Sequence, residues 1–96
     1  MDNTEKEFHL LLVPPEGGER RVPCDSVRFQ IPDGKNGRGG GSVGIRKGHT
    51  DALAAVAPGI LTASKNGEPV FRAKVGEGIA AVTGDSVTVL APYEPA

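Results

Sequence analysis

The stretch that decides the fold runs from Gly41 to Leu61 and reads G-S-V-G-I-R-K-G-H-T-D-A-L-A-A-V-A-P-G-I-L. An apolar strand start is followed by a Gly-His corner at Gly48 and a Pro-Gly turn at Pro58. Such closely spaced breakers leave room only for short elements between them. The segments on either side also show short apolar runs separated by turns.

The segment from Asp51 to Ala57, inside this stretch, is ambiguous from its residues alone. Thr50 could cap a helix, and D-A-L-A-A-V-A has high helix propensity. Pro58 stops the segment after about two turns, which is marginal for an isolated helix. Helix and strand therefore both remain open at this point.

Toward the N-terminus, Phe8 to Val13 is predicted to be the first strand. Alternation places three side chains on each face, namely Phe8, Leu10 and Leu12 against His9, Leu11 and Val13. Both faces are thus partly apolar. Either the strand is buried on both sides within the domain, or a partner covers one of its faces.

The rest of the chain supplies further short strands. Ser26 to Ile31 alternates cleanly between apolar and polar residues, and Glu19 to Pro23 is a short polar strand. Asn66-Gly67 and Gly84-Asp85 each indicate a two-residue hairpin turn. The sequence therefore predicts an all-β fold, an antiparallel β-sandwich or flattened barrel of about nine or ten short strands. We expect one domain over residues 8–91, with tails at 1–7 and 92–96.

Composition excludes several classes of protein. The 96 residues include 11 basic and 12 acidic ones, a net charge of -1, whereas nucleic-acid-binding domains usually carry a basic excess. The single cysteine, Cys24, permits no internal disulfide and is predicted to be a half-buried apolar filler. No apolar run approaches the ~18 residues of a membrane span, and the polar start is unlike a signal peptide. We expect a cytosolic chain.

No motif for catalysis, cofactor binding or metal binding has the sequence context that it needs. Gly39, Gly41 and Gly44 match a dinucleotide fingerprint in spacing, but no strand–helix unit surrounds them. The two histidines, His9 and His49, are each isolated from carboxylates or cysteines at metal-ligand spacing. The sequence predicts no catalytic residue, no metal site and no cofactor.

The segment from Gly34 to Thr50 holds basic residues and no acidic one. It starts in a long glycine-rich loop, Pro32 to Gly41, and its basic residues are Lys35, Arg38, Arg46 and Lys47. The charges either keep a solvated loop soluble or contact a partner that bears acidic or polar groups.

The opening stretch resembles the signature of the epsilon subunit of F-type ATP synthases, called delta in mitochondria. That family typically reads G-x-F-G-I-L-P-G-H-A-P-L-L-T-x-L-x-P-G-x-L. Nine positions match without a gap, namely Gly41, Gly44, Ile45, Gly48, His49, Leu53, Pro58, Gly59 and Leu61. The departures are Val43, Arg46-Lys47 and Asp51. The C-terminal stretch from Gly76 to Ala91 reads G-E-G-I-A-A-V-T-G-D-S-V-T-V-L-A and is similar to the family's G-G-F-L-E-V-x-x-D-x-V-T-V-L-A. The resemblance therefore covers roughly Phe8 to Ala91. The resemblance implies a β-sandwich and puts a strand at residues 51–57.

The resemblance also implies a function, a non-catalytic rotor subunit in the central stalk of the proton-translocating F-type ATP synthase. Such a subunit would bind the gamma subunit and the c-ring and would couple proton-driven rotation to ATP synthesis. The residues expected to face gamma are Leu11, Val13, Pro14, His49, Thr50 and Leu53. Those expected in the loop that faces the ring are Lys35, Arg38, Ser42 and Val43. The chain would be bacterial and cytoplasmic, and would lie on the inner face of the cell membrane only through the complex.

Two alternatives from other classes stay open. One is a free-standing β-sandwich module that binds a small ligand or peptide, and the other is a small hydrolase that uses His49. Most bacterial relatives continue after the V-T-V-L-A strand into two helices that can restrain ATP hydrolysis. Since the sequence ends at Ala96 with Pro92 and Pro95 nearby, we expect no such helical inhibition and no nucleotide binding.

Overall fold

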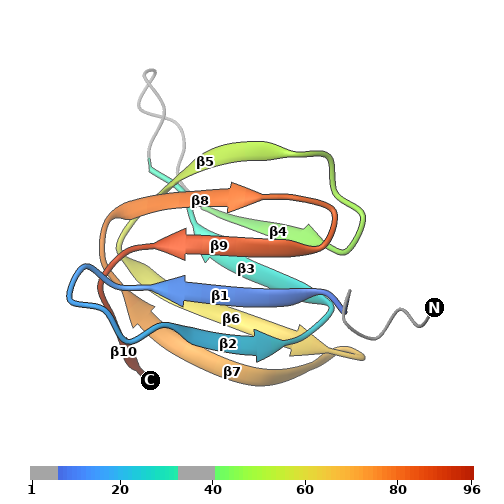
Figure 1. Ribbon diagram of the computed structural model, residues 1–96, viewed down its shortest axis with the longest axis horizontal. Helices are drawn as coiled ribbons and strands as arrows, with labels where there is room; N and C mark the ends of the chain where they lie inside the picture. Colours follow the sequence, from blue (N-terminus) through green and yellow to red (C-terminus); the bar gives the residue numbers. More distant parts are fainter. Residues whose placement is uncertain (1–6, 33–40) are drawn as a thin grey trace.

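The computed structural model describes residues 7–32 and 41–96, and every regular element in these ranges is a strand. The strands form two five-stranded sheets that lie one over the other (Figure 1). Sheet A has the order β2-β1-β9-β8-β5, with β2 Arg20–Pro23, β1 His9–Val13, β9 Ser86–Leu90, β8 Gly78–Val82 and β5 Ala52–Val56. Sheet B has the order β10-β7-β6-β3-β4, with β10 Tyr93–Pro95, β7 Glu68–Val75, β6 Gly59–Lys65, β3 Ser26–Gln30 and β4 Ser42–Arg46. The predicted β-sandwich and its number of strands are confirmed.

All pairs of neighbouring strands are antiparallel except β1 and β9, which run parallel in the middle of sheet A. This pairing joins the two ends of the domain, because β1 opens it and β9 lies near its end. No pattern in the local sequence predicts a pairing between strands so far apart in the chain.

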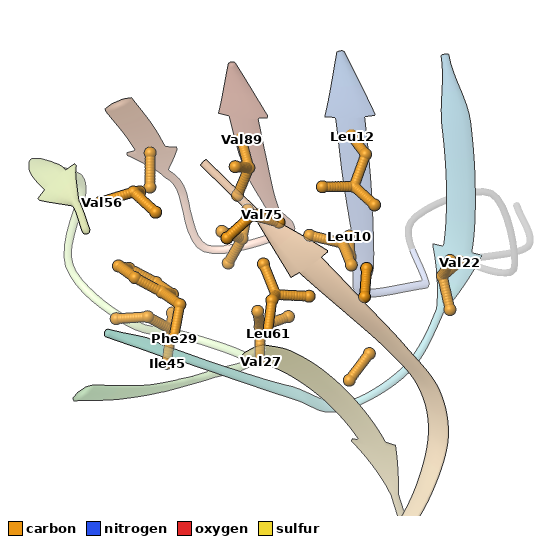
Figure 2. Close-up of a cluster of buried hydrophobic side chains, with 14 of the residues drawn as sticks. Leu10, Leu12, Val22, Val27, Phe29, Ile45, Val56, Leu61, Val75 and Val89 are labelled. Carbon is orange, nitrogen blue, oxygen red and sulfur yellow. The ribbon is translucent and has the colours of Figure 1, made fainter. Parts of the chain in front are cut away.

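The core lies between the sheets and is built by strict alternation along the strands. Every second side chain of each inner strand points inward, where apolar residues interdigitate (Figure 2). In sheet A, Leu10 and Leu12 of β1 are fully buried beside Val87 and Val89 of β9. From sheet B, Val27, Phe29, Leu61 and Ala63 meet them, and all four are 0% exposed. Each large side chain buried this way contributes about 1.5–3 kcal/mol to stability.

The ambiguous segment after Thr50 is a strand, as the family resemblance implied. β5 pairs antiparallel with β8 over its whole length, so its backbone groups that face β8 have partners, whereas a two-turn helix would leave unpaired groups at both ends. Its side chains follow a period of two, with Val56 fully buried and Leu53 pointing to solvent. The predicted Gly-His corner precedes it, and the Gly48 amide donates to the Gly84 carbonyl at 3.0 Å.

Both predicted hairpins form, but by different means. Asn66 and Gly67 have φ of 54° and 81°, as a type I′ turn requires, and they join β6 to β7. Neither Gly84 nor Asp85 has positive φ. There the Thr83 hydroxyl oxygen accepts from the amides of Asp85 and Ser86, each at 3.2 Å, and holds the β8–β9 turn.

The C-terminal residues correct the prediction of a tail over 92–96. Tyr93–Pro95 form β10, which pairs with the outer edge of β7, while the Tyr93 ring packs against the core. The mostly polar composition of residues 92–96 does not indicate a strand. Pro95 is tolerated because β10 is an edge strand, where one missing N–H breaks no inner ladder.

Three further features of the described chain are a buried cysteine, a contact between the two sheets and the absence of a membrane-spanning helix. Cys24 is 2% exposed, so it is an apolar filler that lies deeper than the half-buried position predicted, and its burial raises the pKa of the thiol. The Arg20 guanidinium lies 4.9 Å from the centre of the Phe71 ring and so links β2 of sheet A to β7 of sheet B. Over residues 7–32 and 41–96 there is no helix that could cross a membrane.

Candidate protein-interaction site

The outward side chains of sheet A form an apolar surface across four of its strands. Because the even-numbered residues of β1 and β5 point inward, their odd-numbered neighbours point out, and cross-strand pairing fixes their partners. We call this surface the sheet A patch, and its members are Leu11, Val13, Leu53, Ala55, Ile79, Ala81, Thr88 and Leu90.

The register arranges the patch in two parallel rows. In the first row, Val13 lies beside Leu90, Leu90 beside Ile79, and Ile79 beside Ala55. The second row runs in the same direction and consists of Leu11, Thr88, Ala81 and Leu53. Strands are spaced by about 4.8 Å, so each row spans roughly 15 Å. The patch is therefore wide enough to receive an element of another protein.

The exposure of the patch sets it apart from a core surface. Leu53, Ile79 and Leu90 are 78%, 51% and 49% exposed, and they are three of the five large exposed hydrophobic residues in the described chain. Leu11 and Val13 are half-buried. No charged residue stands in either row, while Arg21 pairs with Leu11 from the edge strand β2. Contiguous apolar surface rimmed by polar groups marks a site of protein interaction.

The structure brings together most of the residues predicted to face gamma. Leu11, Val13 and Leu53 share the sheet A patch. His49 and Thr50 are exposed at the end of the sheet where Gly48 is bonded to the β8–β9 turn, and the His49 Nδ1 lies 2.7 Å from the Thr50 carbonyl oxygen. These two residues therefore border the patch rather than belong to it.

Pro14 does not belong to this surface. It follows Val13 directly, but its side chain is buried within the domain. The fold thus uses Pro14 for its own packing, so this residue offers no exposed side chain to a partner.

Sequence reasoning missed Ile79 and Leu90, which supply much of the exposed area. The signal was available, since β8 and β9 alternate between buried and outward residues and both outward residues are large and apolar. What the sequence lacked was the strand order that sets β8 and β9 between β1 and β5.

Of the residues predicted to face the c-ring, the two described ones lie in a strand rather than in a loop. Lys35 and Arg38 lie outside the described residues. Ser42 and Val43 belong to β4, where Val43 points inward and packs against the core. Ser42 is exposed, and its hydroxyl accepts a hydrogen bond from the Arg28 Nη1 at 3.2 Å. Val43 therefore lies in a strand and not in a loop, and alternation along β4 turns its side chain inward.

A catalytic use of His49 finds no support in the geometry. Within residues 7–32 and 41–96, no serine hydroxyl is hydrogen-bonded to its ring, whose partner is a backbone carbonyl. The same ranges hold no group of three potential metal ligands.

Comparison with known proteins agrees with this geometry. Residues 7–93 match the family model described as the ATP synthase Delta/Epsilon chain, beta-sandwich domain. The chain belongs to this family. A search of curated protein sequences gave no significant match.

Solved structures show the same Delta/Epsilon sandwich fold. One similar chain is in the cryo-EM structure of the Euglena gracilis mitochondrial ATP synthase, comprising OSCP, F1 and the c-ring in rotational state 1. Its TM-score is 0.68 at 22% identity, over 94% of this chain and 54% of that one. Another is in the central stalk and c-ring structure of the Tetrahymena thermophila mitochondrial ATP synthase, with a TM-score of 0.61 at 13% identity, over 90% of this chain and 63% of that one. The sequence thus spans little more than half the length of these two chains.

Proposed function

We propose that this chain is a non-catalytic rotor subunit in the central stalk of a proton-translocating F-type ATP synthase. In this role it binds the gamma subunit through the sheet A patch and also contacts the c-ring. It couples rotation of the ring to ATP synthesis in the catalytic head, and it makes and breaks no bonds itself.

The single observation that carries the proposal is the sheet A patch on a domain of the Delta/Epsilon family. A lone domain gains nothing in stability from side chains such as Leu53, which water still covers. A partner that covers both rows gains the free energy of burying them, and a typical stable interface buries about 800 Å² on each side. His49 and Thr50, at the rim, would supply the polar part of the same contact.

The fold is suited to transmitting torque. The two sheets share one densely packed core, and every strand in the described chain is hydrogen-bonded to at least one neighbour. Close-packed interiors of this kind have low compressibility. A rotor element must pass a turning force from one contact surface to another, and a rigid sandwich does so without a hinge.

The contact with the c-ring is assigned to the segment around Ser42. Of the residues that the family resemblance assigns to it, Ser42 is the one described residue that offers an exposed side chain. Association with the membrane then occurs only through the complex. The two similar structures are mitochondrial, whereas the sequence predicted a bacterial chain on the inner face of the cell membrane.

Affinity purification from the source organism tests the function. The tagged chain is expressed in its own cells, membranes are solubilised in mild detergent, and bound proteins are identified by mass spectrometry. We expect the gamma and c subunits together with the catalytic head. In ATP synthase depleted of this subunit, adding the chain should restore ATP-driven proton pumping in vesicles.

The free-standing binding module predicts a different result. The chain would then be recovered without any ATP synthase subunit, and its addition would leave proton pumping by the depleted complex unchanged. Either outcome contradicts the rotor proposal.

A further inference from the structure

The outer face of sheet B carries a shallow groove of about 270 Å³, and most of the residues that line it are polar or charged. Strands β3, β4 and β6 form its floor. The groove is lined by Ser26, Val27, Arg28, Gly44, Arg46, Thr62, Ser64 and Gly67. It thus combines two guanidinium groups with three hydroxyls and contains no carboxylate.

Cross-strand register brings the two arginines together. Arg28 pairs with Gly44, and Ser26 pairs with Arg46, so the arginines are diagonal neighbours on one face. The Arg28 side chain lies across Gly44, since a Cβ built on that glycine would stand 3.2 Å from the Arg28 Nη2. The missing side chain of Gly44 therefore keeps the floor low and lets the Arg28 guanidinium rest on it.

Among residues 7–32 and 41–96, no carboxylate neutralises the charges of the groove. The one ion pair in the described residues joins Lys65 to Glu7, so neither Arg28 nor Arg46 has a carboxylate within ion-pair distance there. Arg28 donates instead to the neutral hydroxyl of Ser42.

A second hollow continues the groove past Arg46. It is lined by Asp25, Ser26, Arg46, Lys47 and Gly67. The Asp25 carboxylate in it already accepts the Asn66 amide at 2.9 Å. Lys47 thus adds a third positive charge beside the two arginines.

We propose that this groove binds an oxyanion of the phosphate type, held between the Arg28 and Arg46 guanidinium groups. Planar guanidinium groups match the paired oxygens of a phosphate, and the hydroxyls of Ser26, Thr62 and Ser64 supply additional donors. Lys47 lies where a second phosphate group of a longer ligand would extend. Because the groove is open to water, binding weakens as salt concentration rises. This site lies on the face opposite to the sheet A patch, so it is independent of the proposed gamma contact.

NMR titration of the 96-residue chain tests the proposal. Inorganic phosphate and inorganic pyrophosphate are added at constant ionic strength, and the backbone amide shifts are followed. We expect saturable shifts confined to β3, β4 and β6, with pyrophosphate binding more tightly than phosphate. Uniform, non-saturating shifts over the whole surface would overturn the proposal.

Three variants separate a built site from general charge attraction. R28Q and R46Q should each weaken pyrophosphate binding at least about fivefold, the scale of one charge-assisted hydrogen bond at an exposed site. G44V keeps every charge but raises the floor of the groove, and it should weaken binding as much. K74Q is the matched control, because Lys74 is an outward cation of sheet B outside the groove. Equal weakening by K74Q and R28Q would refute the site.

A further experiment distinguishes the two possible sources of the phosphate group, a lipid headgroup and a soluble anion. Sedimentation with vesicles of phosphatidylcholine containing phosphatidylglycerol compares a lipid headgroup with the free anion. If the chain binds these vesicles, R28Q abolishes that binding and free pyrophosphate binds only weakly, the ligand is a lipid headgroup. If free pyrophosphate binds and the vesicles do not, the ligand is a soluble anion. Capture of gamma by R28Q and R46Q at the wild-type level would show that the variants remain folded. If neither probe binds the wild-type chain, the proposal fails while the rotor function stands.

Discussion

Replacing Leu53 with aspartate should weaken binding of the gamma subunit by about 2 kcal/mol or more without unfolding the domain. Leu53 is 78% exposed in the free chain, so most of its apolar surface remains to be buried by a partner. Full burial of a leucine side chain is worth about 1.5–3 kcal/mol, and the exposed share of it therefore about 1–2 kcal/mol. The aspartate would add the cost of placing a carboxylate in an apolar contact. A loss of 2 kcal/mol corresponds to a roughly thirtyfold higher Kd.

The assay is titration calorimetry between the chain and purified gamma subunit, with thermal unfolding of each variant measured in parallel. V70D is the matched control, because Val70 is 49% exposed and points outward from sheet B. I79D should behave like L53D, since Ile79 is 51% exposed in the same patch. Substitutions at such exposed positions change the free energy of unfolding by only about 0.5 kcal/mol.

Two results would refute this reasoning. If L53D and I79D bind gamma as the wild type does, the sheet A patch is not the contact surface. If V70D weakens binding as strongly as L53D, the effect is general to added negative charge and says nothing about the patch.

Other perturbations test the fold itself. L61A removes a fully buried side chain from the core and should lower the free energy of unfolding by about 2–5 kcal/mol, measured by urea denaturation. G78A should cost at least about 1–3 kcal/mol, seen as a lower Tm, because the new Cβ would stand 2.1 Å from the Leu90 carbonyl oxygen. The hydrogen bond and charge of Lys65 lower the pKa of Glu7, so K65Q should raise that pKa in an NMR titration. Because the folded-state pKa of Glu7 is the lower one, the contribution of the pair to stability is present above the unfolded-state pKa and is lost as pH falls through the folded value. An unchanged pKa in K65Q would show that the pair does not persist in solution.

Much of the sandwich could be predicted because its local signals agree. Alternation in the segment around Phe29 gave both the strand and its buried face, and Asn66-Gly67 gave a hairpin with the required positive φ. The candidate site was partly predictable for the same reason. Once β1 was read as a strand with two apolar faces, Leu11 and Val13 were candidates for a partner surface.

Long-range pairing was beyond the sequence. The parallel contact of β1 with β9, and with it the placement of Ile79 and Leu90 beside Val13, depends on which strands meet in the folded chain. β10 was missed because an edge strand of three residues, one of them proline, carries no periodic signal. Pro14 was misplaced because the direction of a side chain at the end of a strand depends on the turn that follows.

Both faces of β1 are apolar, whereas the outward face of its neighbour β9 is partly polar. Apolar alternation alone would not stop β1 from slipping by one residue, which would turn Leu11 and Val13 into the core. β9 alternates cleanly, with Val87 and Val89 fully buried and Thr88 outward beside Leu11.

A slip of β1 would also carry His9 inward and expel Phe8, which is 1% exposed in the observed register. Burying an imidazole without a hydrogen-bond partner costs free energy, and exposing a phenylalanine forfeits some of the largest apolar burial in the domain. The aromatic ring just before the strand and the histidine that opens it thus fix the register. With the register fixed, the outward apolar residues of β1 are free to serve a partner without competing for the core.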